Sequence, residues 1–159
     1  MPSIKSQKEC FRLTDKVSPA FTGKPVNRYY GFGLFAAIYG AEIKNLTLDN
    51  LEITGQGVTG GLVGIAYAPE TAKSPSDFNK ITNCHITNTC KINTHFTHDR
   101  TYAGTLANDN DYQVGLVGGI VARAMGTTIE YCSSDIEIEV GGTFSNVGGI
   151  VSHAGYNSV

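Results

Sequence analysis

The stretch Gly118-Gly119-Ile120-Val121 decides how the chain folds, because variants of it occur four times. The other copies are Gly33-Leu34-Phe35, Gly60-Gly61-Leu62-Val63 and Gly148-Gly149-Ile150-Val151. With one glycine of each copy as an anchor, the copies are spaced by 28, 58 and 30 residues, the anchors being Gly33, Gly61, Gly119 and Gly149. Recurrence at a period of this size indicates a repeat architecture, in which each repeat stacks on its neighbour.

A second phrase follows each of the first three anchors. Its copies are Ile43-Lys44-Asn45-Leu46, Ile81-Thr82-Asn83-Cys84 and Ile129-Glu130-Tyr131-Cys132. The isoleucine comes 10, 20 and 10 residues after its anchor, and the next anchor follows 18, 38 and 20 residues later. The second repeat is therefore an ordinary repeat that carries two insertions, of roughly 10 and 20 residues.

These spacings predict how the chain is divided. Residues 1–30 are the least periodic part, and we expect an N-terminal cap or an incomplete first coil there, because a stack of coils needs its end covered. Repeats fill residues 31–159, with boundaries at 31–59, 60–114, 115–147 and a partial repeat at 148–159. The partial repeat presents an uncovered strand edge. We expect either end-to-end association of the chain or loss of regular structure after about Ser152.

The segments between the phrases alternate in polarity, as strands with one buried face do. In the first repeat the alternating apolar residues are Leu46, Leu48, Leu51 and Ile53, and the phase breaks at Asp49-Asn50, which indicates a corner. Stacking in register predicts an inward column of Leu46, Cys84 and Cys132, beside a column of Ile43, Ile81 and Ile129. Asn83 repeats Asn45 and Asn88 repeats Asn50, so asparagine ladders are expected. The predicted fold is all-β: a right-handed parallel β-helix (β-solenoid) of about three coils with an N-terminal cap.

Composition excludes several functions. A net charge of -2 with 16% charged residues gives no electrostatic basis for binding nucleic acid or an anionic membrane. No apolar run approaches the roughly 20 residues of a spanning helix, and no signal peptide is visible. The four cysteines, Cys10, Cys84, Cys90 and Cys132, include no C-x-x-C pair, which argues against a zinc ribbon. Small buried apolar residues are the preferred interpretation of the cysteines. The alternative is a disulfide between adjacent coils.

Catalytic signatures are missing from the sequence, which has no H-E-x-x-H, no G-x-S-x-G and no P-loop. Asp135, Glu137 and Glu139 form an outward acidic row on a strand whose isoleucines point inward. Carboxylates in such a row serve some polysaccharide-cleaving enzymes as acid and base, but exposed carboxylates are also what a solvated face carries. We therefore assign no catalytic residue and expect no enzyme. A carbohydrate-active enzyme that uses this row is kept as an alternative.

The two insertions, residues 66–79 and 94–113, are where we expect a binding site, because long loops on a rigid scaffold usually carry function. The candidate ligand-binding residues are Tyr102, Tyr112, Asp109, Asp111, His95 and His98. Tyrosines in loops stack on sugar rings or anchor protein partners. Asp109-Asn110-Asp111 offers some oxygen ligands for calcium, without a complete calcium motif, and we predict no metal site and no cofactor.

At its glycine phrases the chain resembles the GLUG-motif repeats, named for a Gly-Leu-(any)-Gly core. The resemblance rests on Gly61-Leu62-Val63-Gly64 and Gly115-Leu116-Val117-Gly118, with Gly33-Leu34-Phe35 and Gly149-Ile150-Val151 as looser copies. The family pattern continues into a "T-I-x-N-C" strand, which Thr82-Asn83-Cys84 and Thr128-Ile129-Glu130-Tyr131-Cys132 are similar to. These repeats occur in bacterial surface and secreted proteins, including the non-catalytic part of some IgA-cleaving proteases.

The resemblance implies a β-helical repeat module of a bacterial cell-surface or secreted protein. Combined with the insertions, it predicts an adhesin-like, non-enzymatic module that binds a glycan or protein partner through loops of the second repeat. A component of a phage-like fibre or another stacked assembly is a further alternative, which a trimeric mass in solution would favour.

Overall fold

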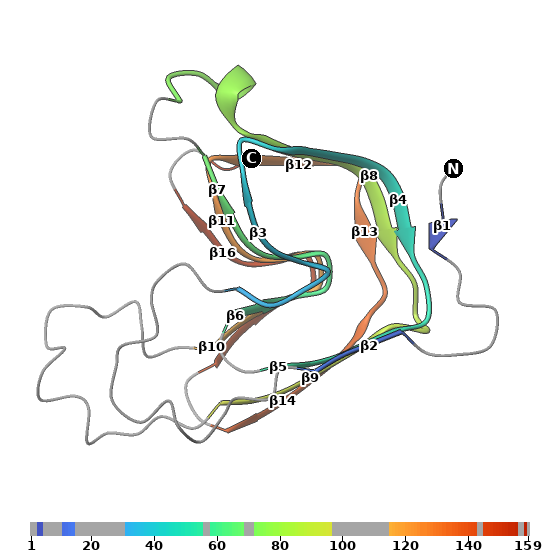
Figure 1. The fold of residues 1–159 in the computed structure, drawn as a ribbon. Helices are drawn as coiled ribbons and strands as arrows, with labels where there is room; N and C mark the ends of the chain where they lie inside the picture. Colours follow the sequence, from blue (N-terminus) through green and yellow to red (C-terminus); the bar gives the residue numbers. More distant parts are fainter. Residues whose placement is uncertain are drawn as a thin grey trace, which may run out of the picture.

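The fold is described from a computed structural model for residues 3–4, 11–14, 31–55, 58–68, 72–96, 115–142, 145–155 and 158. The described residues form short β-strands and one 3-10 turn, η1 (Pro75–Asp77). All the strand pairs in this part of the chain are parallel, and they build four stacked sheets (Figure 1). The prediction of an all-β fold with parallel, stacked strands is thus confirmed.

In Figure 1 sheet A forms the upper and right-hand walls, and sheet B forms the lower wall. Sheet A contains β1 (Ser3–Ile4), β4 (Glu42–Leu48), β8 (Asn79–Ile86), β12 (Thr127–Glu130) and β13 (Ser133–Ser134). Sheet B contains β2 (Phe11–Thr14), β5 (Leu51–Gly55), β9 (Lys91–Phe96) and β14 (Glu137–Gly142). In both sheets the spatial order of the strands follows the order of the chain, so each repeat adds one layer.

The other two sheets form a wedge that points into the molecule (Figure 1). Sheet C contains β6 (Val58–Gly60), β10 (Gly115–Gly118) and β15 (Ser145–Gly148). Sheet D contains β3 (Phe35–Tyr39), β7 (Val63–Tyr67), β11 (Val121–Met125) and β16 (Val151–Gly155). The tip of the wedge is the turn between sheets C and D, which is where the glycine phrases lie.

Strand register confirms the predicted apolar columns. Ile43, Ile81 and Ile129 stack on one another, and Leu46 stacks on Cys84. The members of these columns in β8 are fully enclosed, since Ile81 is 0% and Cys84 1% exposed, whereas Ile43 and Leu46 are partly buried. The core is therefore a set of continuous columns that run through the layers, as the repeating sequence requires.

The anchor glycines are needed at the wedge tip because the layers approach each other closely there. Neither Gly61 nor Gly119 has a left-handed φ, so conformational freedom is not the reason. A Cβ on Gly61 would overlap the carbonyl oxygen of Gly119 and lie 2.8 Å from Ile86 Cδ1. A Cβ on Gly119 would overlap the carbonyl oxygen of Gly149 in the same way. A side chain at this point would separate adjacent layers.

The two literal Gly-Leu-Val-Gly copies occupy different places in the fold. Residues 61–64 run from the wedge tip into β7, whereas residues 115–118 are the whole of β10 in sheet C. Register pairs Gly60 with Gly118, so the structural equivalent of residues 61–64 is residues 119–122. The repeating unit is thus the glycine pair with the aliphatic pair that follows it.

One predicted asparagine ladder is present, and the other is replaced. Asn83 Nδ2 donates to Asn45 Oδ1 at 2.8 Å. Both residues have left-handed φ values, 54° and 56°, which asparagine tolerates better than most residues. At the next corner the backbone N–H of Asn50 instead donates to Thr89 Oγ1 at 2.8 Å. The corner after Ile86 is one residue longer than that after Leu48, so Asn88 does not take the place of Asn50.

The two ends of the stack carry strands of their own. At the first end β1 pairs with β4 and β2 with β5, in the part of the chain for which a cap or incomplete coil was expected. At the last end β16 pairs with β11 as far as Gly155, and the hydroxyl of Ser158 donates to the carbonyl of Ala124 at 3.1 Å. The expected loss of regular structure after about Ser152 was therefore wrong, because the repeat pairing continues.

Candidate functional site

The first insertion leaves between sheets D and A in the second repeat. Tyr39 and Glu42 are three residues apart, whereas their register partners Tyr67 and Lys80 are thirteen apart. The extra residues include η1, which projects outward from the side of the stack, at the top of Figure 1. The standard repeats close this corner directly, so the insertion is an addition to a complete scaffold.

The end of this insertion is held by Asp77. Its carboxylate accepts hydrogen bonds from the backbone N–H groups of Lys73 at 3.0 Å and Ser74 at 3.2 Å. These two bonds stabilise the ionised form and lower the pKa of Asp77 below its ordinary value of 3.8. Phe78, which follows, is 9% exposed and anchors the segment to the stack. Residues 73–78 therefore form a turn that is held by hydrogen bonds and has a polar surface.

The second insertion leaves between sheets B and C of the same repeat. Gly55 and Gly60 are five residues apart, whereas their register partners Thr94 and Gly118 are 24 apart. His98, Tyr102, Asp109, Asp111 and Tyr112, with the calcium candidate Asp109-Asn110-Asp111, lie outside the described residues. His95 lies in β9, where its backbone pairs with that of Gly141.

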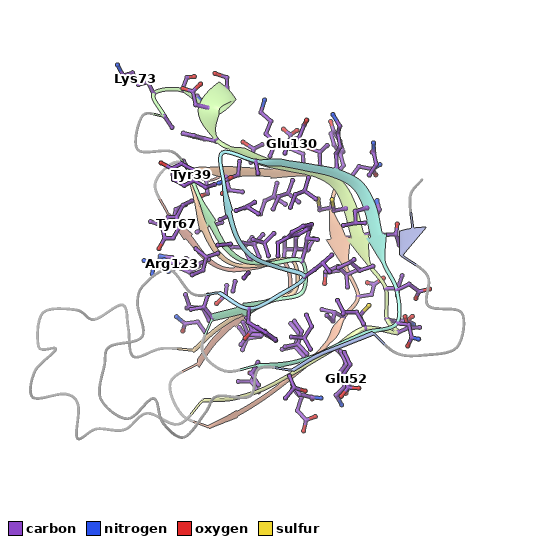
Figure 2. All side chains as sticks on the ribbon, in the orientation of Figure 1. Tyr39, Glu52, Tyr67, Lys73, Arg123 and Glu130 are labelled. Carbon is purple, nitrogen blue, oxygen red and sulfur yellow. The ribbon has the colours of Figure 1, made fainter. Side chains whose placement is uncertain are left out.

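The outer face of sheet D brings together residues that sequence reasoning did not combine. Tyr39 and Tyr67 stack in register, with Met125 as the next member of their column. The neighbouring column contains Ile65, Arg123 and His153. Figure 2 shows Tyr39, Tyr67 and Arg123 along the outer side of this sheet, below the first insertion. We call Tyr39, Tyr67 and Arg123 the sheet D surface.

A signal for the sheet D surface is present in the sequence. Both tyrosines come six residues after their anchor glycines, Gly33 and Gly61. Tyr39 is 61% exposed and lies in the outermost described strand of sheet D. Only the register shows that Tyr67 lies directly beside Tyr39.

The acidic row on sheet B is part of a ladder of alternating charge. Lys91 Nζ lies 3.1 Å from Glu137 Oε1 and 3.3 Å from Glu139 Oε2. On its other side Lys91 is in register with Glu52. Hydrogen bonds to Glu137 and Glu139 raise the pKa of Lys91. The two carboxylates thus share one cation, and the geometry provides no pair of opposed acid and base.

A series of hydrogen-bonded polar side chains on the outer face of sheet A links three layers, and sequence reasoning did not predict it. His85 Nδ1 lies 2.8 Å from Ser133 Oγ, and His85 Nε2 lies 3.0 Å from Asn83 Oδ1. Because the amide of Asn83 donates to Asn45, its oxygen is left to accept from Nε2–H, so Nδ1 accepts from the serine hydroxyl. An amide in this place cannot balance a charged imidazole as a carboxylate does. These hydrogen bonds therefore connect adjacent layers, and the group of residues is a poor catalytic triad.

The described cysteines are free thiols, so the alternative of an inter-coil disulfide is not realised in this structure. Cys84 and Cys90 are each 1% exposed, which fits small apolar core residues. Cys132 is half-buried, and its sulfur accepts from the backbone N–H of Cys84 at 3.4 Å. A hydrogen bond from the Cys84 thiol, aided by that N–H, lowers the pKa of Cys132 to about 6. The same coupling raises the pKa of Cys84.

Comparison with known protein families gives one match. The family model of the GLUG motif matches residues 114–139, which span β10, β11, β12 and β13 and the start of β14. The predicted resemblance is thereby confirmed for the third repeat. No curated protein and no solved structure matches the chain. Among the described residues, no helix is long and apolar enough to cross a membrane, and no group of three or more metal-ligating side chains occurs.

Proposed function

We propose that the chain is a non-enzymatic binding module of a bacterial cell-surface or secreted protein, built as a right-handed parallel β-helix. The module binds a glycan or a protein partner on the side from which the second repeat extends its insertions. The observation that carries this proposal is the in-register pair of tyrosines on the sheet D surface, with Tyr39 61% exposed.

The helical path is supported by the strand pairing. The repeats pass through the sheets in the same order and pair in parallel, with one strand per sheet except in sheet A, where β12 and β13 both pair with β8. A parallel strand is reached from its neighbour by a crossover connection, and such connections are right-handed in about 98% of cases. The handedness proposed for the β-helix follows from this preference.

The chemistry of the surface suits a sugar. Flat tyrosine rings present an apolar face for the C–H groups of a pyranose. Adjacent layers of a parallel sheet are about 4.8 Å apart, so Tyr39 and Tyr67 offer a continuous strip rather than two separate rings. Arg123 brings a guanidinium to the same face, which favours a glycan that carries carboxylate or sulfate groups.

The GLUG match supports the cellular setting, because a repeat module of a surface or secreted protein is what the motif suggests. The second insertion extends the proposed site. Tyr102, Tyr112, Asp109 and Asp111, with His95 and His98 as weaker contributors, are proposed as a second set of contacts, and calcium as an optional ligand of the Asp109-Asn110-Asp111 stretch. End-to-end association is treated separately below.

The test is binding to an array of neutral and acidic bacterial and host glycans, followed by titration of the best ligand. Tyr39→Ala and Tyr67→Ala are each expected to weaken binding by about 0.5–1.5 kcal/mol, a loss of roughly 2- to 12-fold. Tyr131→Ala is the matched control, because this tyrosine is 81% exposed but lies on sheet A. Equal binding by all three variants and the parent chain would refute the sheet D surface as the site.

The second insertion is tested by replacing residues 97–111 with a short Gly-Ser link. Loss of binding with an unchanged melting temperature would assign contacts to that loop. Unchanged binding and stability would show that the loop is merely tolerated. The alternative enzymatic function is tested with a panel of polysaccharides, and cleavage that is lost in Glu137→Gln would favour it over the binding module.

A further inference from the structure

The described strands make a whole number of passes through the four sheets. Beginning at β1, the chain visits sheets A, B, C and D in that order and ends in sheet D at β16. In the first pass the sheet C position is taken by Phe32, whose backbone bridges Thr59 of β6. Its N–H donates to the carbonyl of Val58 and its carbonyl accepts from Gly60 N–H, both at 2.8 Å. No sheet is skipped and none is visited twice in a pass.

The two ends of the stack are therefore complementary. At the first end, the outermost described positions are β1, β2, Phe32 and β3, one in each of sheets A, B, C and D. At the last end, the outermost strands are β12 with β13, β14, β15 and β16, which again occupy all four sheets. If the first end of a second copy were placed on the last end of this one, every sheet would continue with one strand per layer.

Apolar columns that are sealed in the middle layers are open at these ends. Val63 and Val121 are both 0% exposed, whereas Phe35, at the head of their column, is 39% exposed. At the last end Ile150 is 36% exposed, whereas Ile120, the preceding member of its column, is 0% exposed. Val147 is 54% exposed above Val117, which is 1% exposed. Each end therefore shows apolar surface that another layer would cover.

The sheet B columns specify which layer fits. One column runs through Leu13, Ile53, Ile92 and Ile138, and a second copy would place its Leu13 above Ile138. The adjacent column runs through Arg12, Glu52, Lys91 and Glu137, so the sign of the charge alternates from layer to layer. The next residue in this series, Arg12 of a second copy, again has the sign opposite to Glu137. Across the contact between two copies, the first column would thus remain apolar and the second would keep its alternation of charge.

We propose that the last end of the stack, formed by β12, β13, β14, β15 and β16, binds the first end of a second copy of this chain, formed by β1, β2, Phe32 and β3. The contact is heterologous, because two different surfaces meet. It repeats by translation along the stack and so generates open, linear assemblies rather than closed dimers. Strand edges that have no partner among the described residues supply backbone hydrogen bonds at both ends, and the apolar columns supply buried area.

The test uses the whole chain in sedimentation velocity over a wide range of concentration. The mass is expected to rise from 17.0 kDa in a continuous series of species. Ile150→Lys blocks the last end and Phe35→Lys blocks the first end, at positions already exposed in the single chain. Each variant alone is expected to lose assembly beyond the monomer. Asn88→Lys adds the same charge at an exposed corner of a middle layer and is expected to assemble normally.

Mixing the two blocked variants distinguishes this contact from any symmetric one. Ile150→Lys retains an intact first end and Phe35→Lys an intact last end, so an equimolar mixture is expected to form a dimer of one of each. A dimer in either variant alone, or a parent chain that stays monomeric at all concentrations, would overturn the proposal. Should a lysine variant fail to fold, Gly149→Ala replaces Ile150→Lys, because a Cβ at Gly149 meets no atom within 4 Å in the single chain.

Discussion

Gly119 and Gly149 allow the energetic cost of a side chain between closely approaching layers to be measured, because they are equivalent residues in different surroundings. Both precede an Ile-Val pair at the wedge tip, and neither has a left-handed φ. A Cβ at Gly119 would overlap the carbonyl oxygen of Gly149 and lie 2.5 Å from Ser134 Oγ. A Cβ at Gly149 would meet no atom within 4 Å. The two Gly→Ala substitutions thus add the same methyl group, which meets neighbouring atoms at Gly119 and none at Gly149.

The expected cost at Gly119 follows from what the methyl group meets. Overpacking a filled site costs about 1–3 kcal/mol, and a backbone carbonyl held in the pairing between layers yields less than a side chain would, so the upper end applies. Restricting the unfolded chain returns about 0.4–1 kcal/mol in both variants. Gly119→Ala is therefore expected to lose about 2 kcal/mol, and Gly149→Ala to be neutral or slightly more stable than the parent chain.

The assay is thermal and denaturant unfolding at a protein concentration low enough to prevent self-association. For a chain of this size, about 2 kcal/mol corresponds to a fall in melting temperature of roughly 4–8 °C for Gly119→Ala. Gly149→Ala should melt with the parent chain. Equal melting temperatures for the two variants would refute the argument that steric approach, rather than backbone conformation, requires glycine at the wedge tip.

Three further predictions concern the core, a thiol and the first insertion. Ile92→Ala, at a residue that is 0% exposed, should cost about 2–5 kcal/mol in denaturant unfolding, and Ile138→Ala, in the outermost layer of the same column, clearly less. Cys132 should be alkylated by iodoacetamide with a rate that rises through pH of about 6, and Cys84→Ala should move that midpoint upward, because it removes the stabilising donor. An unmoved midpoint would exclude Cys84 as the cause. Asp77 has a lowered pKa, so its contribution to stability is present above its ordinary pKa of 3.8 and disappears as the pH falls through the lowered value. Asp77→Asn should therefore speed proteolysis of the first insertion near neutral pH but not in strong acid, and equal digestion rates at neutral pH would contradict this.

The layered core was predictable from sequence because each layer must match the layers beside it. A residue such as Ile81 contacts Ile43 on one side and Ile129 on the other, so burial selects the same type of residue at the same offset in every repeat. The periodicity of the chain is the direct trace of this contact. The alternation along each strand then indicates which columns face inward.

The corners and the outer surface were less predictable because no such matching constrains them. The corner between sheets A and B has a different length in each repeat, and the chain absorbs the difference there without disturbing the paired strands. Outward columns also change chemistry from layer to layer, as Tyr39, Tyr67 and Met125 do. The hydrogen bond between His85 and Ser133 was not predicted from the sequence, because the two residues are unrelated in type and 48 positions apart.

The separation between inward and outward columns explains how one scaffold can hold both a binding surface and a stacking surface. Radial positions, such as the sheet D surface and the insertions, contribute nothing to the fit between layers, so they are free to differ between repeats. Positions at the ends of the inward columns, such as Ile138, Ile150 and Phe35, must instead resemble the buried residues of the same columns, because they pack against them. Tyr39 belongs to both sets, because it lies in β3 at the first end, whereas Tyr67 lies in a middle layer. Tyr67→Ala should therefore leave assembly intact, and Ile150→Lys, which blocks the opposite end, should leave single-site glycan affinity intact. Assembly would nevertheless align many weak sites along one axis, and the resulting gain in avidity is how a surface of two tyrosines per chain would hold a polymeric glycan firmly.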